Sequence, residues 1–292
     1  MRTDQLTPPV ELIPAQRQVL WGWPAVANFA LGGTGAGLYA VAVLASGFER
    51  SPVVAFVSWL APLLVLAGLA AVAGEAGRPL RGPRVLWRVR TSWMSRELWL
   101  GAVFVLLVAA DIVFPLPFLR APALAAAVLF ALAQGFIVRQ ARGIPAWDVS
   151  AMPWLFLLSA GVSGAGAFLV IEANNHRALA PRVLLASMLL LIVSLWAGRV
   201  YVSASGGRGF REATAGLRHG PLAKIIAGGG LLLPLGVLVV ALAAPAIAGP
   251  AAGLAGALMV AGQVYAKREL ILEAGQLRPI TVAHLRLSRR SP

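Results

Sequence analysis

The chain consists of long runs of apolar residues separated by short polar segments. A helix needs about 20 mostly apolar residues to cross the hydrocarbon core of a bilayer. The runs are continuously apolar and lack the inside–outside alternation of barrel strands, so they predict helices. Eight stretches qualify: 24–46, 53–73, 98–114, 121–138, 150–171, 183–203, 221–243 and 250–270. The predicted fold class is therefore an all-α integral membrane protein with eight transmembrane helices.

Two features of the pattern qualify this prediction. The third and fourth stretches are short and are joined by a segment that contains Pro115, Pro117 and Pro122, so a single broken span is the alternative there. Residues 1–23 are polar and end at Trp21 and Trp23, followed by a proline. This N-terminal segment predicts an aromatic anchor at the membrane interface, with proline in the first turn of the first helix.

Composition excludes several kinds of redox site. The chain has 292 residues, of which 59% are hydrophobic and only 12% charged, against about 25% charged in soluble domains. It has no cysteine, which excludes disulfides, thiolate zinc sites and iron–sulfur clusters held by this chain. Its three histidines all fall in predicted loops or the tail, so bis-histidine haem within the bundle is not expected.

The distribution of positive charge predicts an orientation. The net charge of +14 is typical of proteins that bind nucleic acid or membranes, and the long apolar runs favour the membrane over nucleic acid. With eight spans both termini lie on one side, and that side carries 21 of the 25 Lys and Arg residues. The positive-inside rule then places both termini in the cytoplasm, in a multi-pass protein of the inner (cytoplasmic) membrane.

An internal similarity indicates two halves. When the sequence is shifted by 129 residues, Pro24 falls on Pro153, and the Gly-Ala-Gly of residues 35–37 falls on the same three residues at 164–166. Such a register predicts two four-helix bundles related by a parallel internal repeat. The alternative is that small residues recur in any closely packed membrane helix. Neither glycine cluster has the spacing of a nucleotide-binding loop.

Polar side chains cluster near the ends of the first four predicted spans. Polar and ionisable groups at membrane depth are costly, and each is therefore a functional candidate. The candidates are Asn28, Glu75, Glu97 and Gln134, with Trp23 at the rim and with Arg78 and Arg81 directly after Glu75. The alternative is that Glu and Arg at helix ends only extend to the interface and pair there. Asp111 lies on the opposite side, next to the proline-rich loop, and is interpreted as structural.

This combination of groups suits a small apolar molecule with carbonyl or hydroxyl groups, such as a quinone. Reduction of a quinone takes up two protons, which a carboxylate near the membrane surface can exchange. Glu75 and Glu97 are therefore the candidates for proton transfer, and the remaining polar residues are candidates for binding the headgroup.

Two motifs resemble a known family. The segment GRPLR at residues 77–81, followed by RTSWMSRE at residues 90–97, resembles the signature of the DMSO-reductase membrane-anchor family. The opening WGWP at residues 21–24, with Gly32 and Gly33, resembles the related polysulfide-reductase (NrfD) anchor family. In helix number and division into halves, the resemblance covers essentially the whole chain.

The resemblance implies a non-catalytic anchor subunit at which quinone reacts. It implies menaquinone or ubiquinone as the ligand, and a four-cluster iron–sulfur subunit and a molybdopterin catalytic subunit as partners in a respiratory complex. Arg81 and Glu97 match positions that the family uses at or near the quinone, and Asn28 matches a polar position of the first helix. Glu75 departs from the pattern, because the DMSO-reductase branch has a histidine there.

Four segments follow from these predictions. Residues 1–23 form an interfacial segment, residues 24–138 a first half with the quinone site, residues 139–270 a second half, and residues 271–292 a basic tail. In the family the termini, the quinone site and the partner share one face, often the periplasmic one. Because that face is predicted to be cytoplasmic here, the catalytic partners are expected in the cytoplasm.

Two functions without quinone chemistry remain as alternatives. Secondary transporters also have repeats and glycine-rich helices, but they should show broken helices or charges at matching positions of the two halves. A proton-translocating subunit would use Asp111, Glu172 and His176 to form an exit on the far side of the membrane.

The charge asymmetry leads to a test of orientation. A reporter enzyme fused to the C-terminus should be active only if it functions in the cytoplasm. Paired fusions of a cytoplasmic reporter and a periplasmic phosphatase at the same position measure this. A strongly active phosphatase fusion would contradict the predicted orientation.

Overall fold

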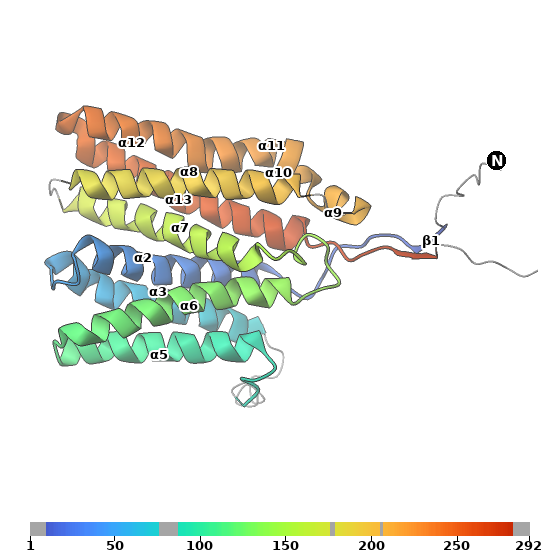
Figure 1. Cartoon of the computed structure of the whole chain (residues 1–292), viewed down its shortest axis with the longest axis horizontal. Coiled ribbons are helices and arrows are strands. Elements are labelled where there is room, and N and C mark those ends of the chain that lie inside the picture. Colours follow the sequence, from blue (N-terminus) through green and yellow to red (C-terminus); the bar gives the residue numbers. More distant parts are fainter. Residues whose placement is uncertain (1–9, 76–86, 176–178, 205–206, 283–292) are drawn as a thin grey trace, which may run out of the picture.

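The long helices lie side by side along one direction (Figure 1). The computed structural model describes residues 10–75, 87–175, 179–204 and 207–282. The first membrane-length segment consists of α1 (Trp23–Ala27), η1 (Asn28–Gly32) and α2 (Gly33–Ala45). The long helices that follow it are α3 (Pro52–Glu75), α5 (Trp93–Val113), α6 (Arg120–Arg139), α7 (Met152–Asn174), α8 (Pro181–Ser203), α12 (Leu233–Ala243) and α13 (Ala248–Arg268).

Short elements lie between these helices and near the two ends of the chain. They are β1 (Val10–Ile13), η3 (Pro117–Leu119), α9 (Arg208–Ala213), α10 (Ala215–His219), α11 (Pro221–Lys224), η4 (Ile225–Leu232), η5 (Pro245–Ile247), η6 (Glu269–Glu273) and β2 (Ile280–Val282). Proline lies in the first turn of most membrane-length segments, where its missing N–H costs no intrahelical hydrogen bond. These prolines are Pro24, Pro52, Pro117, Pro153, Pro181, Pro221 and Pro245.

Seven helical segments in the described residues are long and apolar enough to cross a membrane. The one predicted span that is not among these seven is the third, residues 98–114. It corresponds to α5, which is 21 residues long and carries three charged side chains, Arg96, Glu97 and Asp111. It lies alongside the others in Figure 1. The protein is thus an α-helical membrane protein, and the count of eight spans stays a prediction.

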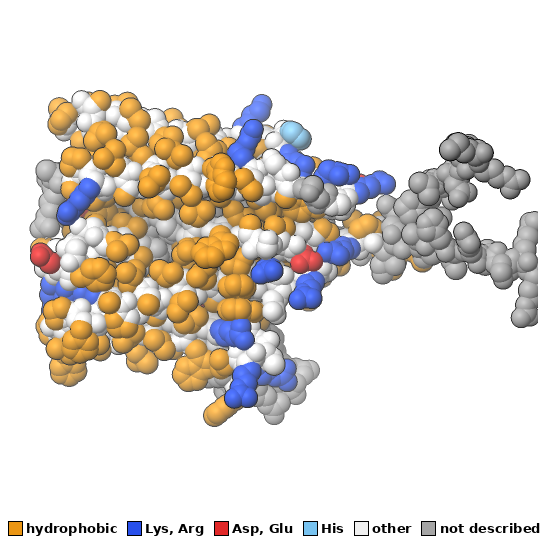
Figure 2. All heavy atoms as spheres, viewed as in Figure 1, with side chains coloured by type: hydrophobic (Ala, Val, Ile, Leu, Met, Phe, Trp, Pro, Cys, Tyr) orange, Lys and Arg blue, Asp and Glu red, His pale blue; other side chains and the backbone are white. Residues whose placement is uncertain are grey.

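The surface agrees with a membrane setting. In Figure 2 apolar side chains cover the long sides of the bundle, and most Lys and Arg side chains in this view gather at the end from which the chain termini extend. Large apolar side chains on this surface include Trp59, Leu106, Trp154, Leu189 and Trp196, each more than half exposed. A large exposed apolar surface of this kind is typical of a protein that contacts lipid.

Both ends of the chain leave the bundle on the same side. β1 and β2 pair antiparallel (Figure 1), a contact that the sequence pattern did not predict. Between these strands and the helices, the backbone N–H of Gln18 donates to the carbonyl oxygen of Gly275 at 2.8 Å. The backbone N–H of Leu277 donates to the carbonyl oxygen of Gln16 at 2.7 Å. The paired termini confirm the prediction that they share one side, while the cytoplasmic assignment stays a prediction.

Glycines bring the backbones of three helices into direct contact. A Cβ atom at Gly37 in α2 would overlap the carbonyl group of Ala160 in α7, and one at Gly164 would overlap the backbone of Gly37. Further along α7, a Cβ at Gly166 would lie 2.6 Å from the carbonyl oxygen of Gly256 in α13. Because only glycine fits at these crossings, α7 can pack closely against both α2 and α13.

The predicted parallel repeat also stays a prediction. Residues 28–32 form the π-helical segment η1, whereas their counterparts at residues 157–161 lie in the regular α-helix α7. The repeated glycines meet different neighbours too, since Gly35 packs against Ala61 in α3 and its counterpart Gly164 packs against α2.

A buried ion pair lies at the end of the bundle opposite the termini. Arg120 donates through Nε to Oδ2 of Asp111 at 3.1 Å, and both side chains are almost fully buried. Arg120 also donates through Nη1 to the carbonyl oxygen of Phe48, whose backbone adopts a positive φ of 67°. The pair therefore ties the connection between α5 and α6 to the turn after α2. This is the arrangement expected of a structural role for Asp111.

The glycine contacts lead to a test of stability. Gly164→Ala should lower the free energy of unfolding by roughly 1–3 kcal/mol, because the added methyl group forces α2 and α7 apart. Gly236 in α12 is the matched control, because a Cβ there would meet nothing within 4 Å. Gly236→Ala should be neutral or stabilising by up to about 1 kcal/mol. Thermal unfolding of the two variants in detergent measures the difference, and equal stabilities would contradict the proposed role of the contact.

Candidate functional site

Three polar side chains from three helices meet inside the first half of the bundle. Oε1 of Glu97 in α5 accepts hydrogen bonds from Nδ2 of Asn28 at 3.0 Å and from Nε2 of Gln134 at 3.1 Å. All three residues are buried, with no more than 5% of any of them exposed. We call Asn28, Glu97 and Gln134 the amide–carboxyl cluster. The structure thus brings together three of the seven candidate residues, and their role in binding quinone stays a prediction.

The local backbone makes room for this cluster. Asn28 begins η1, and a π-helical turn shifts the regular pattern of backbone hydrogen bonds. The carbonyl oxygen of Asn28 accepts a further hydrogen bond from Nε2 of Gln134 at 3.2 Å. A Cβ atom at Gly32 would lie 2.8 Å from that same Nε2, and one at Gly68 would lie 3.0 Å from the carbonyl oxygen of Asn28. Glycine at these two positions lets α3 and α6 approach η1.

Two neutral amide groups hold the carboxyl group of Glu97. Among the described residues Glu97 forms no ion pair, and it accepts hydrogen bonds from Asn28 and Gln134. A carboxyl group that forms no ion pair with the described residues is a suitable candidate for a proton carrier. Oδ1 of Asn28 is buried and has no hydrogen-bond partner in the described part of the chain. The cluster therefore offers an acceptor that a ligand hydroxyl group can use.

Trp23 lies apart from the cluster. Its side chain is 59% exposed, and the guanidinium carbon of Arg268 lies 6.0 Å from the centre of its ring. This placement fits the aromatic anchor that the sequence predicts at the membrane surface. It does not bring Trp23 into contact with Glu97.

For the remaining candidates the structure describes at most the backbone. Glu75 ends α3, seven residues beyond Gly68, which corresponds to about 10 Å along the helix axis, and the position of its side chain is not described. Arg78 and Arg81 fall in residues 76–86, which are not described either. Among the described residues no group of three or more His, Cys, Asp or Glu side chains could hold a metal ion.

One residue of the second half also approaches the cluster. Lys267 of α13 is 4% exposed, and its Nζ has no hydrogen-bond partner among the described residues. A Cβ at Gly33 would lie 3.2 Å from this Nζ and 3.4 Å from Oε1 of Gln134. In the sequence Lys267 enters only as one of the 21 Lys and Arg residues on the side of the termini. Its spacing of four residues from Gln263, which itself follows Met259 by four, is the signal that places it on the buried face of α13.

Comparisons with known proteins give one match. A family model described as "DMSO reductase anchor subunit (DmsC)" matches residues 18–206, about two thirds of the chain. The matched part contains the amide–carboxyl cluster and extends from the segment before α1 to the end of α8. A search of curated proteins found no match.

Proposed function

The chain belongs to the family of DMSO reductase anchor subunits, and from that premise we propose that it binds quinone at the amide–carboxyl cluster. It is a multi-pass membrane protein and the anchor of a molybdoenzyme complex. The finer part of the proposal is that electrons pass here between menaquinone or ubiquinone and an iron–sulfur partner. That partner would carry four clusters and connect the anchor to the molybdopterin subunit.

The carboxyl group of Glu97 carries the proposal. Quinone supplies two-electron chemistry in which two protons are taken up or released, so its site needs a group that exchanges protons. Glu97 is buried at the end of α5 on the side of the termini, and Asn28 and Gln134 fix its position. Fixed hydrogen bonds keep a proton-transferring group in the geometry that the reaction requires.

The other polar atoms fit a quinone headgroup. Oδ1 of Asn28 can accept a hydrogen bond from a hydroxyl group, and the ring of Phe130 lies beside Gly32 next to the amide of Gln134. We extend the proposal to Glu75, Arg78 and Arg81, which lie in the sequence between the end of α3 and α5. Trp23 would then contact the quinone tail at the rim.

The two alternatives receive less support. Broken helices at matching positions would favour a transporter, but the counterpart of η1 in the second half is a regular α-helix. For a proton-translocating subunit, Asp111 would serve on the far side, and it is held by Arg120 in a buried ion pair. The geometry of the described residues therefore favours a quinone site on the side of the termini.

Glu97→Gln tests the proposal. The variant keeps the shape of the side chain but cannot exchange a proton, so quinone-linked activity of the whole complex in membranes should fall by roughly 10²–10⁴-fold. Activity of the catalytic subunit with an artificial electron-donating dye should stay normal, because that assay bypasses the anchor.

The control is Glu49→Gln, at an exposed carboxyl group beyond the far end of α2, which should leave both activities unchanged. The proposal fails if Glu97→Gln assembles normally and retains the quinone kinetics of the unaltered complex.

A further inference from the structure

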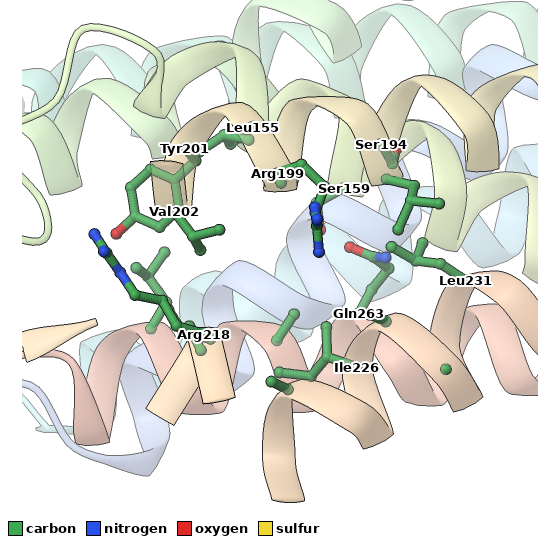
Figure 3. Close-up of a pocket in the computed structure, with 18 of the residues that line it drawn as sticks. Leu155, Ser159, Ser194, Arg199, Tyr201, Val202, Arg218, Ile226, Leu231 and Gln263 are labelled. Carbon is green, nitrogen blue, oxygen red and sulfur yellow. The ribbon is translucent and has the colours of Figure 1, made fainter. Parts of the chain in front are cut away.

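The second half of the bundle contains a large cavity. It has a volume of about 660 Å³ and lies between α7, α8, η4 and α13, with α10 and α11 at one end (Figure 3). Most of its wall is apolar, and Leu155, Val202, Ile226 and Leu231 contribute to it. Quinone binding at the amide–carboxyl cluster does not use this cavity.

The charged groups of the cavity wall all have one sign. Arg199, Arg218, Lys224 and Lys267 line it, and no Asp or Glu is among its lining residues. Figure 3 shows the heads of Arg199 and Gln263 pointing toward each other across the space. Four cationic groups around an apolar cavity favour an anionic ligand, because like charges in a low dielectric repel one another unless a counter-charge is present.

Several donors of the wall have no partner in the described part of the chain. They are Nζ of Lys267, Nη2 of Arg218 and the hydroxyl groups of Ser159 and Ser194, all buried. Lys267 has the strongest need for a counter-charge, since only 4% of the residue is exposed and it lies within a candidate membrane span. An unpaired buried ammonium group costs several kcal/mol, and a bound anion removes that cost.

Two contacts within the protein fix the position of the Arg218 side chain. Its Nε donates to Oγ1 of Thr214 at 3.1 Å, and its guanidinium carbon lies 5.5 Å from the centre of the Phe210 ring. Nη2 has no hydrogen-bond partner among the described residues. A guanidinium group fixed in this way loses little conformational entropy when it binds a phosphate.

The cavity is also polarised along its length. Its cationic residues lie toward the end of the bundle that carries the chain termini, where α8 ends and α11 begins. Ser194 lies five residues before Arg199 in α8, about 7.5 Å deeper, and faces the apolar part near Leu231. A charged head and an apolar tail would match the two ends.

We propose that this cavity binds an anionic phospholipid, with its headgroup at the end that Arg199, Arg218, Lys224 and Lys267 line and an acyl chain along Leu231. Basic pockets between membrane helices bind lipid headgroups through this chemistry. A quinone fits less well, because its headgroup is neutral and needs one or two donors rather than four cations. The proposal is independent of the quinone site.

Titration of the purified full chain in a neutral detergent tests this. The probes are phosphatidylglycerol, phosphatidylcholine, inorganic phosphate and a short-chain quinone, and bound molecules are detected by native mass spectrometry. Phosphatidylglycerol should bind about 10-fold or more tightly than phosphatidylcholine, since only the former leaves a net negative charge for the cations to neutralise.

Two variants identify the site. Lys267→Met and Arg199→Gln should each weaken binding of phosphatidylglycerol by about 10- to 100-fold and leave phosphatidylcholine unchanged. Arg139→Gln is the matched control: this arginine is exposed in the last turn of α6, does not line the cavity and should have no effect. Lys267→Met removes a buried charge without a partner, so folding should be retained. If that variant fails to fold, Arg199→Gln at its exposed position decides the matter.

Three results would overturn the proposal. The first is equal binding of the two lipids, and the second is an unchanged affinity for phosphatidylglycerol in Arg199→Gln. The third is displacement of phosphatidylglycerol by inorganic phosphate or by the quinone at equal concentration, which would assign the cavity to a small anion or to quinone instead.

Discussion

The contact between the backbones of α2 and α7 is the constraint on which the rest of the bundle depends. Gly37 and Gly164 allow it, because any side chain at either position would overlap the other helix. Apolar surface gives little preference for a helix neighbour over lipid tails, so close packing has to supply the specificity. With α7 fixed against α2 and, through Gly166, against α13, the two halves form one body.

This packing determines where polar groups can be buried. In a bilayer a buried polar group needs a partner inside the protein, and two clusters at opposite ends of the first half provide such partners. Asp111 and Arg120 neutralise each other on the far side and tie down a turn. Among the described residues Glu97 instead accepts hydrogen bonds from two amides, and its carboxyl group is the one that we propose exchanges protons. The same physical requirement thus yields a structural pair and a candidate reactive group.

In the second half some buried polar groups have no partner in the described part of the chain. Its cavity is lined by four cationic residues, of which Lys267 at Nζ and Arg218 at Nη2 have no hydrogen-bond partner among the described residues. Lys267 reaches Gly33 beside Gln134 as well, so it lies between the cavity and the amide–carboxyl cluster. A phospholipid there would neutralise charge at the boundary between the two halves and stabilise their packing next to the proposed quinone site.

The sequence by itself determined the membrane class, the positions of the long helices and the shared side of the termini. It also placed Asn28, Glu97 and Gln134 in one larger group with Glu75, Arg78 and Arg81, because the cost of polar residues at membrane depth is visible in hydropathy along the chain. Only the tertiary structure decided which faces meet. The π-helical turn at Asn28, the pairing of β1 with β2 and the burial of Lys267 depend on neighbours far apart in the sequence, and hydropathy is a local property that carries no information about them.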